Sequence, residues 1–166
     1  MTTRSGNPQA HTGHAHKGDT MNIGGIDLVD LLFTFQGRSN RGKYWLAILL
    51  YVIGWIVIGI VAWALSMVSY ILGAIVAVLI LIATIVSGVF VGIKRLHDRD
   101  KSGWWLAFFY LVPAVLQGIG GGIGGIGFIL SLAGFAISIW AFVELGCLRG
   151  TAGPNQYGPD PLAGRA

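Results

Sequence analysis

A run of 50 residues without a charged side chain, residues 44–93, constrains the fold of this chain most strongly. As one continuous α-helix the run would be about 75 Å long, whereas the hydrocarbon core of a bilayer is about 30 Å thick. The run is therefore predicted to cross a membrane twice, with a break near the sequence SMVSY at residues 66–70.

A second uncharged run covers residues 104–143 and predicts two further crossings, because 40 residues of helix would be about 60 Å long. The expected break is the glycine-dense segment 117–125. Pro113 is expected to kink the third crossing or to end its regular part, and a re-entrant hairpin is the alternative for this crossing. Charged residues make up 11% of the chain, against about 25% in soluble domains, which argues against a soluble fold.

The predicted organisation is a disordered cytoplasmic tail, a four-helix transmembrane domain and a short final tail, at residues 1–22, 23–162 and 163–166. The four spans are expected at about residues 44–65, 70–93, 104–117 and 124–144. The first tail contains no apolar segment of the kind found in signal peptides. Its His11, His14 and His16 are expected to be solvated, because a flexible tail gives a metal site no fixed geometry.

The Lys and Arg residues indicate how the chain crosses the membrane. Five precede the first span, four lie between the second and third spans, and two follow the fourth, whereas the other two loops contain no charge. Loops on the cytoplasmic side of membranes carry an excess of Lys and Arg. We therefore expect an all-α membrane protein with four transmembrane helices, N-in and C-in, with the central loop also in the cytoplasm.

Small residues at a spacing of four predict close contacts between helices in the membrane. Gly88 and Gly92 form a GxxxG motif, and the same spacing recurs in two further pairs, Gly127 with Ser131 and Gly134 with Ser138. The spacing does not distinguish a partner helix within the chain from a helix of another copy.

Three polar motifs are expected on the cytoplasmic face. They are FQGRSNRGKYW at residues 35–45, RLHDRDKSGWW at residues 95–105, and the turn-rich RGTAGPNQYGPDP at residues 149–161. We predict that they form a polar cap or a lipid-headgroup site, with the candidate residues Arg38, Arg41, Arg95, His97, Asp98, Ser102, Trp104, Asn155 and Tyr157.

Asp98 is the most informative of these residues, because topology requires positive charge but no aspartate. A carboxylate at the membrane boundary is costly unless it is paired. We therefore expect Asp98 to accept hydrogen bonds from Arg41, Arg95 or a backbone N–H. Asn155 and Tyr157 are expected to complete the cap, and Glu144, at the end of the fourth span, to face lipid headgroups.

In this order, the three motifs resemble the DUF805 family, small bacterial inner-membrane proteins of unassigned activity. The residues that carry the resemblance are Phe-x-Gly-Arg-x-x-Arg-x-x-Tyr-Trp at 35–45, Arg-Leu-His-Asp…Ser-Gly-Trp-Trp at 95–105, and Gly-Thr-x-Gly-x-Asn-x-Tyr-Gly-x-Asp-Pro at 150–161. With the spans between them they cover residues from about 28 to 162. The resemblance implies a location in the bacterial cytoplasmic membrane and no particular reaction.

The expected function is non-catalytic, namely the binding of anionic membrane lipid or of a partner protein through the cap. Basic groups beside the membrane attract anionic headgroups by about 1 kcal/mol each, and aromatic residues such as Trp104 mark the membrane interface. A second copy of the chain or another membrane protein are the candidate partners. No catalytic residue, cofactor, metal or nucleic-acid partner is expected.

The alternative function is a headgroup-level enzyme or small transporter that uses Arg95, His97 and Asp98. A histidine serves as a general base and an arginine holds a phosphate in such sites. However, adjacent residues on a helix do not face each other, so His97 and Asp98 are a poor catalytic pair. The predicted spans also lack the ionisable residues that coupled transport usually requires.

Overall fold

The computed structural model describes residues 22–23, 26–121 and 124–163 of the chain. Of the disordered tail expected at residues 1–22, residues 1–21 with their histidines lie outside this part, and Asn22 instead belongs to a short strand. Most of the predicted final tail also lies outside this part. The described part contains two helical hairpins, a short helix beside the first of them, and a C-terminal segment without regular helix.

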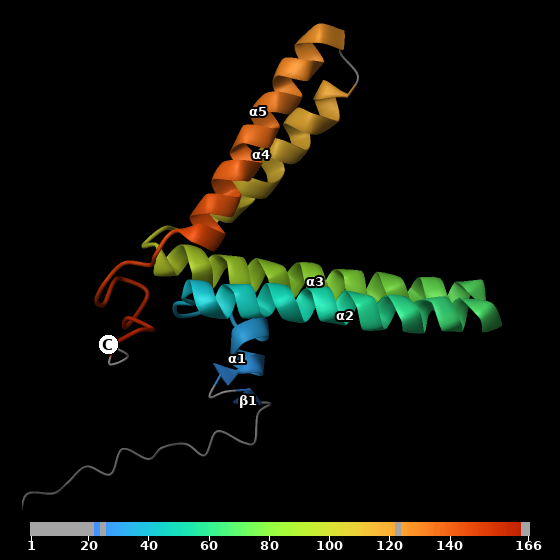
Figure 1. Cartoon of the computed structure of the whole chain (residues 1–166), viewed down its shortest axis with the longest axis horizontal. Coiled ribbons are helices and arrows are strands. Elements are labelled where there is room, and N and C mark those ends of the chain that lie inside the picture. Colours follow the sequence, from blue (N-terminus) through green and yellow to red (C-terminus); the bar gives the residue numbers. More distant parts are fainter. Residues whose placement is uncertain (1–21, 24–25, 122–123, 164–166) are drawn as a thin grey trace, which may run out of the picture.

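The first hairpin pairs α2 (Arg41–Val68) with α3 (Tyr70–Asp98), and the second pairs α4 (Trp104–Gly120) with α5 (Gly124–Phe142). The hairpins meet at one end and diverge from there (Figure 1). The helices α2 and α3, and α5 with its extension, are long and apolar enough to cross a membrane, and α4 is apolar but shorter. The prediction of an all-α membrane protein with four apolar helices is confirmed.

The helix boundaries follow from local sequence. The α2 helix begins at Arg41 because the Asn40 side chain accepts a hydrogen bond from the Lys43 N–H at 2.9 Å, which satisfies one of the free donors of the first turn. Ser69 alone separates α2 from α3. The α4 helix is continuous through Pro113, and α3 extends to Asp98, so that the first part of RLHDRDKSGWW is helical rather than a loop.

A short N-terminal unit packs against the first hairpin. Two-residue strands, β1 (Asn22–Ile23) and β2 (Ile26–Asp27), pair in antiparallel fashion and lead into α1 (Leu28–Phe33). Within α1, Leu28 and Leu31 are buried in a core with residues of α2 and α3. The buried Lys94 side chain donates from Nζ to the Asp30 carbonyl, which attaches the end of α1 to α3.

A second core lies where the hairpins meet. It consists of Leu96 from α3, Leu106 and Phe109 from α4, and Leu145 just beyond α5. The ring of Phe109 also lies edge-on to Trp140, with centroids 5.2 Å apart. This core lies at the end where the polar motifs gather, so the hairpins are joined near their polar ends.

Glycines allow close contact between α4 and α5. A Cβ atom at Gly127 would lie 2.1 Å from the Gly120 carbonyl oxygen, and one at Gly134 would lie 3.2 Å from the Pro113 carbonyl oxygen. The small residues of α5 thus serve a contact within the chain. The two glycines of the GxxxG motif of α3 differ in their surroundings. Gly92 packs against Leu106 of α4, whereas a Cβ at Gly88 would meet nothing within 4 Å.

Candidate functional site: a polar cap where the helix ends meet

The cap is built around the C-terminal end of α5, which continues as a π-helical turn, η1 (Val143–Cys147). The last carbonyls of a helix lack helical donors and carry partial negative charge. Arg95 satisfies two carbonyls here, donating from Nε to Leu145 O at 2.6 Å and from Nη2 to Leu148 O. The indole N–H of Trp45 donates to Gly146 O at 3.0 Å. Side chains from the first hairpin therefore terminate the second.

Arg38 likewise donates hydrogen bonds to backbone carbonyls, here in the C-terminal segment that follows η1. Its Nη2 donates to Thr151 O at 2.6 Å and its Nη1 to Gly153 O at 2.7 Å. The Arg38 side chain is 1% exposed. Because Arg38 precedes α2 in an extended stretch, its side chain reaches the C-terminal segment and holds it against the helix ends.

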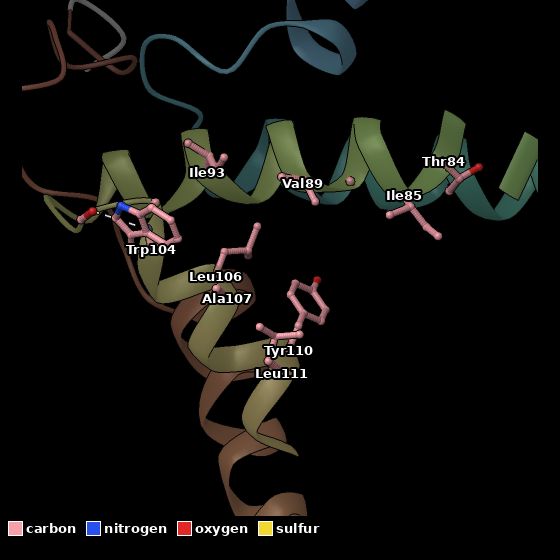
Figure 2. A pocket seen from close by; sticks show the side chains of 12 residues that line it. Thr84, Ile85, Val89, Ile93, Trp104, Leu106, Ala107, Tyr110 and Leu111 are labelled. Carbon is pink, nitrogen blue, oxygen red and sulfur yellow. Dashed lines mark hydrogen bonds between the residues drawn. The ribbon is translucent and has the colours of Figure 1, made fainter. Parts of the chain in front are cut away.

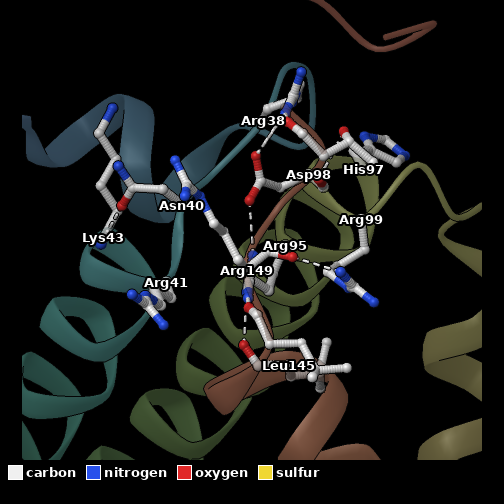
Figure 3. Close-up of polar contacts among 12 residues, drawn as sticks. Arg38, Asn40, Arg41, Lys43, Arg95, His97, Asp98, Arg99, Leu145 and Arg149 are labelled. Atoms are coloured by element: carbon white, nitrogen blue, oxygen red, sulfur yellow. Dashed lines mark hydrogen bonds and ion pairs between the residues drawn. The ribbon is translucent and has the colours of Figure 1, made fainter. Parts of the chain in front are cut away.

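Asp98 lies between these two arginines (Figure 3). Its Oδ2 is 2.7 Å from Arg95 Nη1, and its Oδ1 is 3.1 Å from Arg38 Nη2. We call Arg38, Arg95 and Asp98 the arginine cluster. It has two positive charges and one negative charge, and the carbonyls described above supply the remaining acceptors, as a buried ion group requires.

Of the two arginines expected as alternative partners of Asp98, Arg95 contacts the carboxylate and Arg41 does not. Arg41 lies in the first turn of α2, is exposed, and points its Nη1 at the Cys147 carbonyl at 3.5 Å. Arg38 takes the place expected for Arg41, because it lies before the helix and its direction is not fixed by the helical turn.

The C-terminal segment also caps α3. The Thr151 N–H donates to Asp98 O at 2.8 Å, and the Asn155 side-chain amide donates to His97 O at 2.9 Å. The Asp160 carboxylate accepts from Gly153 N–H at 3.0 Å and from Leu162 N–H at 2.9 Å. These two donors stabilise the ionised form and lower the pKa of the Asp160 carboxyl.

His97 and Asp98 have different partners despite being neighbours in the chain. The His97 ring stacks on Tyr157 with centroids 3.8 Å apart and planes 4° apart, and its Nδ1 is 3.3 Å from Gly37 O. The Asp98 carboxylate contacts the arginines instead. The two side chains therefore form no catalytic pair, and His97 acts as a flat surface on which the C-terminal segment packs.

Glu144 is the second buried carboxylate of the cap, and the expectation that it faces headgroups is wrong. Its side chain is 4% exposed, and Oε1 is 3.0 Å from both Arg99 Nε and Lys101 Nζ. Lys101 also lies over the ring of Trp105, 5.3 Å from its centroid. The loop between the hairpins is thereby tied to the end of α5.

The nine predicted residues divide into two groups. Six take part in the internal contacts of the cap, namely Arg38, Arg95, His97, Asp98, Asn155 and Tyr157. Arg41, Ser102 and Trp104 are exposed, Trp104 by 84%. Sequence reasoning missed the roles of Glu144 and Thr151. For Glu144 a signal exists, because an acidic residue at the end of an apolar run requires a cation nearby.

Comparison with known proteins identifies relatives along most of the chain. A family model described as "Protein of unknown function (DUF805)" matches residues 32–159. The chain is 32% identical to the inner membrane protein YhaI of Escherichia coli (strain K12) over 131 residues, which are 78% of this chain and 87% of YhaI. It is 30% identical to the inner membrane protein YhaH of the same organism, over 76% of this chain and 86% of YhaH. No solved structure matches.

Proposed function

Because this chain belongs to the DUF805 family and is a multi-pass protein of the inner membrane, we propose that it is a non-catalytic membrane component that binds anionic lipid headgroups beside its polar cap. The observation that carries this proposal is a set of three cations, Arg41, Lys43 and Arg149. Within the described residues, none of them has a carboxylate within ion-pair distance. We call these three residues the basic edge (Figure 3).

The arginine cluster is a poor candidate for the same role. The guanidinium groups of Arg38 and Arg95 donate to Asp98 and to backbone carbonyls, and both side chains are at most 1% exposed. A phosphate would have to displace these partners. The arginine cluster therefore holds the fold together. The cations of the basic edge, which have no carboxylate partner among the described residues, are the positive charges that can bind an anionic headgroup.

The surroundings of the basic edge suit a headgroup. Arg41 and Lys43 belong to the first turn of α2, where the helix dipole favours an anion. Trp45, which is 44% exposed, follows them at the position of an interfacial aromatic residue. Each cation close to an anionic membrane surface contributes about 1 kcal/mol, so three of them would favour anionic over zwitterionic lipid.

The alternative of a headgroup-level enzyme or small transporter is less well supported. It requires His97 and Asp98 to act on one substrate, but His97 stacks on Tyr157 and Asp98 is held by two arginines. Neither side chain is free for proton transfer without opening the cap.

The test compares lipid retention by native mass spectrometry of the full chain released from nanodiscs of phosphatidylglycerol and phosphatidylethanolamine. The wild type is expected to retain phosphatidylglycerol in preference. The triple variant Arg41→Gln, Lys43→Gln, Arg149→Gln should lose that preference. The matched control exchanges the same cations, Arg41→Lys, Lys43→Arg, Arg149→Lys, and should keep it.

Two results would overturn this proposal. One is a wild type that retains both lipids equally. The other is a neutral triple variant whose preference equals that of the wild type while its melting temperature is unchanged.

A further inference from the structure

The diverging hairpins enclose an apolar cleft between α3 and α4, with a volume of about 860 Å³ (Figure 2). We call it the wedge cleft. Its walls are mostly aliphatic and aromatic, with Ile85, Val89, Leu106 and Leu111 among them, and Ser102 lies at the end nearest the polar cap. Thr84 adds no free donor, because its hydroxyl donates to the Ile80 carbonyl of its own helix at 2.9 Å. The walls therefore suit a hydrocarbon chain.

A smaller cavity of about 350 Å³ lies among α4, α5 and the first turn of α2. We call it the hydroxyl pocket, because Tyr44, Tyr110, Gln117 and Ser138 line it. Within the described part of the chain, the hydroxyls of Tyr44 and Tyr110 and the Gln117 amide have no hydrogen-bond partner, whereas the Ser138 hydroxyl donates to its own helix.

The backbone of α4 lacks one helical hydrogen bond beside this pocket. Pro113 has no N–H, so the carbonyl of Phe109 lacks its helical donor, and both residues line the pocket. Polar groups without partners cost several kcal/mol each where a membrane excludes water. These groups therefore favour a ligand that brings hydrogen-bonding atoms to the hydroxyl pocket.

No lining residue of the hydroxyl pocket is charged, so a charged ligand would lack the partner that a buried ion requires. The ligand class that fits is uncharged and carries at least one hydroxyl group. Leu145, whose carbonyl accepts from Arg95, also lines this pocket. The arginine cluster thus fixes one wall of it, and the wall keeps its shape while the cap is closed.

Tyr110 lines both cavities, and Figure 2 shows its side chain projecting from α4 toward α3. One molecule with a hydrocarbon chain and a neutral hydroxyl headgroup could therefore occupy both cavities, with its chain in the wedge cleft and its hydroxyl in the hydroxyl pocket. We propose that the wedge binds a lipid with an uncharged hydroxyl headgroup, of the diacylglycerol class. Its chain lies in the wedge cleft, and its hydroxyl group bonds with Tyr44, Tyr110 and Gln117. This site is separate from the basic edge and selects a different headgroup.

The test measures retention of dioleoylglycerol by native mass spectrometry of the full chain from phosphatidylglycerol nanodiscs doped with that lipid. The double variant Tyr44→Phe, Tyr110→Phe removes two hydroxyls and no carbon. Two hydrogen bonds contribute about 1 kcal/mol each, so retention should fall about tenfold or more. Tyr70→Phe is the matched control, because Tyr70 is exposed and lines neither cavity.

A second variant tests the wedge cleft itself. Gly88→Leu places a side chain in the wedge cleft, which Gly88 lines, and its Cβ would meet nothing within 4 Å. It should abolish dioleoylglycerol retention. Gly59→Leu is its control, because Gly59 is equally open, lies in α2 and lines neither cavity. The neutral triple variant of the basic edge should leave dioleoylglycerol retention unchanged, which separates the two proposals.

Three outcomes would overturn the assignment. The first is a wild type that retains no dioleoylglycerol, which would show that the hydroxyl pocket does not bind this lipid. The second is displacement of the lipid by free glycerol at equal concentration, which would show that the chain is not recognised. The third is a lipid-free dimer that Gly88→Leu disrupts, which would identify a second copy as the occupant of the cleft.

Discussion

The backbone of Gly150 lies directly against the carboxylate of Asp98, so that a Cβ atom at position 150 would be 2.0 Å from Asp98 Oδ2. The carboxylate cannot move aside, because Arg95 holds Oδ2 and Arg38 holds Oδ1. The absence of a side chain at position 150 is thus what allows the C-terminal segment to reach the end of α3.

Gly150→Ala is therefore expected to destabilise the protein by about 1–3 kcal/mol, the usual cost of overpacking a filled site. The measurement is the melting temperature of the purified protein in detergent. Gly118→Ala is the matched control, because a Cβ at Gly118 meets nothing within 4 Å and alanine favours a helix over glycine. Equal melting of the two variants would contradict the close contact at Asp98.

Asp98→Ala should have a larger effect than Gly150→Ala. It leaves Arg38 and Arg95 buried without a carboxylate, and removing one partner of a buried ion pair costs about 3–5 kcal/mol. Arg41→Ala serves as the control, since Arg41 is exposed and contacts one carbonyl at 3.5 Å. A melting temperature for Asp98→Ala equal to that of the wild type would rule out a structural role for the arginine cluster.

The C-terminal segment should loosen in acid through Asp160. Hydrogen bonds from Leu162 and Gly153 lower the pKa of this carboxyl in the folded protein. Its contribution to stability is therefore fully present above the pKa of the unfolded chain and is lost as the pH falls through the lowered folded pKa. Over that range the protection of the Gly153 N–H from hydrogen exchange, measured relative to an unfolded peptide at the same pH, should fall in the wild type. In Asp160→Asn the protection should show no such pH-dependent loss, and a loss of equal size there would exclude Asp160 as the cause.

The polar cap collects the start of α2, the ends of α3 and α5 and the start of α4 at one end of the molecule. Together with the positions of Lys and Arg, this predicts that residue 166 lies in the cytoplasm and Gly121 on the opposite side. Reporter fusions at these two sites measure the orientation. A periplasmic reporter that is active at residue 166 would reverse the predicted topology.

The membrane fold could be predicted because its signals are local. The uncharged runs predict the number of helices, the Lys and Arg residues predict which helix ends lie in the cytoplasm, and the glycine-dense segment marks the second break. The DUF805 resemblance could likewise be read from three short motifs, and the family match confirms it.

The partners within the cap could not be predicted, because they join residues far apart in the chain. Arg38 and Arg41 belong to the same motif and carry the same charge, and the start of α2 at Arg41 decides which of them turns inward. Glu144 was misplaced because its partners, Arg99 and Lys101, are separated from it in the chain by the second hairpin. The arginines bind backbone carbonyls between residues 145 and 153. The side chains of that segment do not reveal which of its carbonyls lack helical donors, so these contacts could not be predicted from the sequence.

The length of chain between the partners of the cap has a consequence for synthesis. Arg38 precedes its carbonyl partners by 113 and 115 residues, and Arg95 precedes Leu148 by 53. At about 5–20 residues per second, the ribosome needs roughly 6–23 seconds to add the residues that separate Arg38 from Thr151. During that interval both helical hairpins are made, and Arg38 and Arg95 are synthesised before their carbonyl acceptors. A nascent chain truncated before residue 145 would have its spans but not the segment that closes the cap, so the cap can close only after this segment has been made.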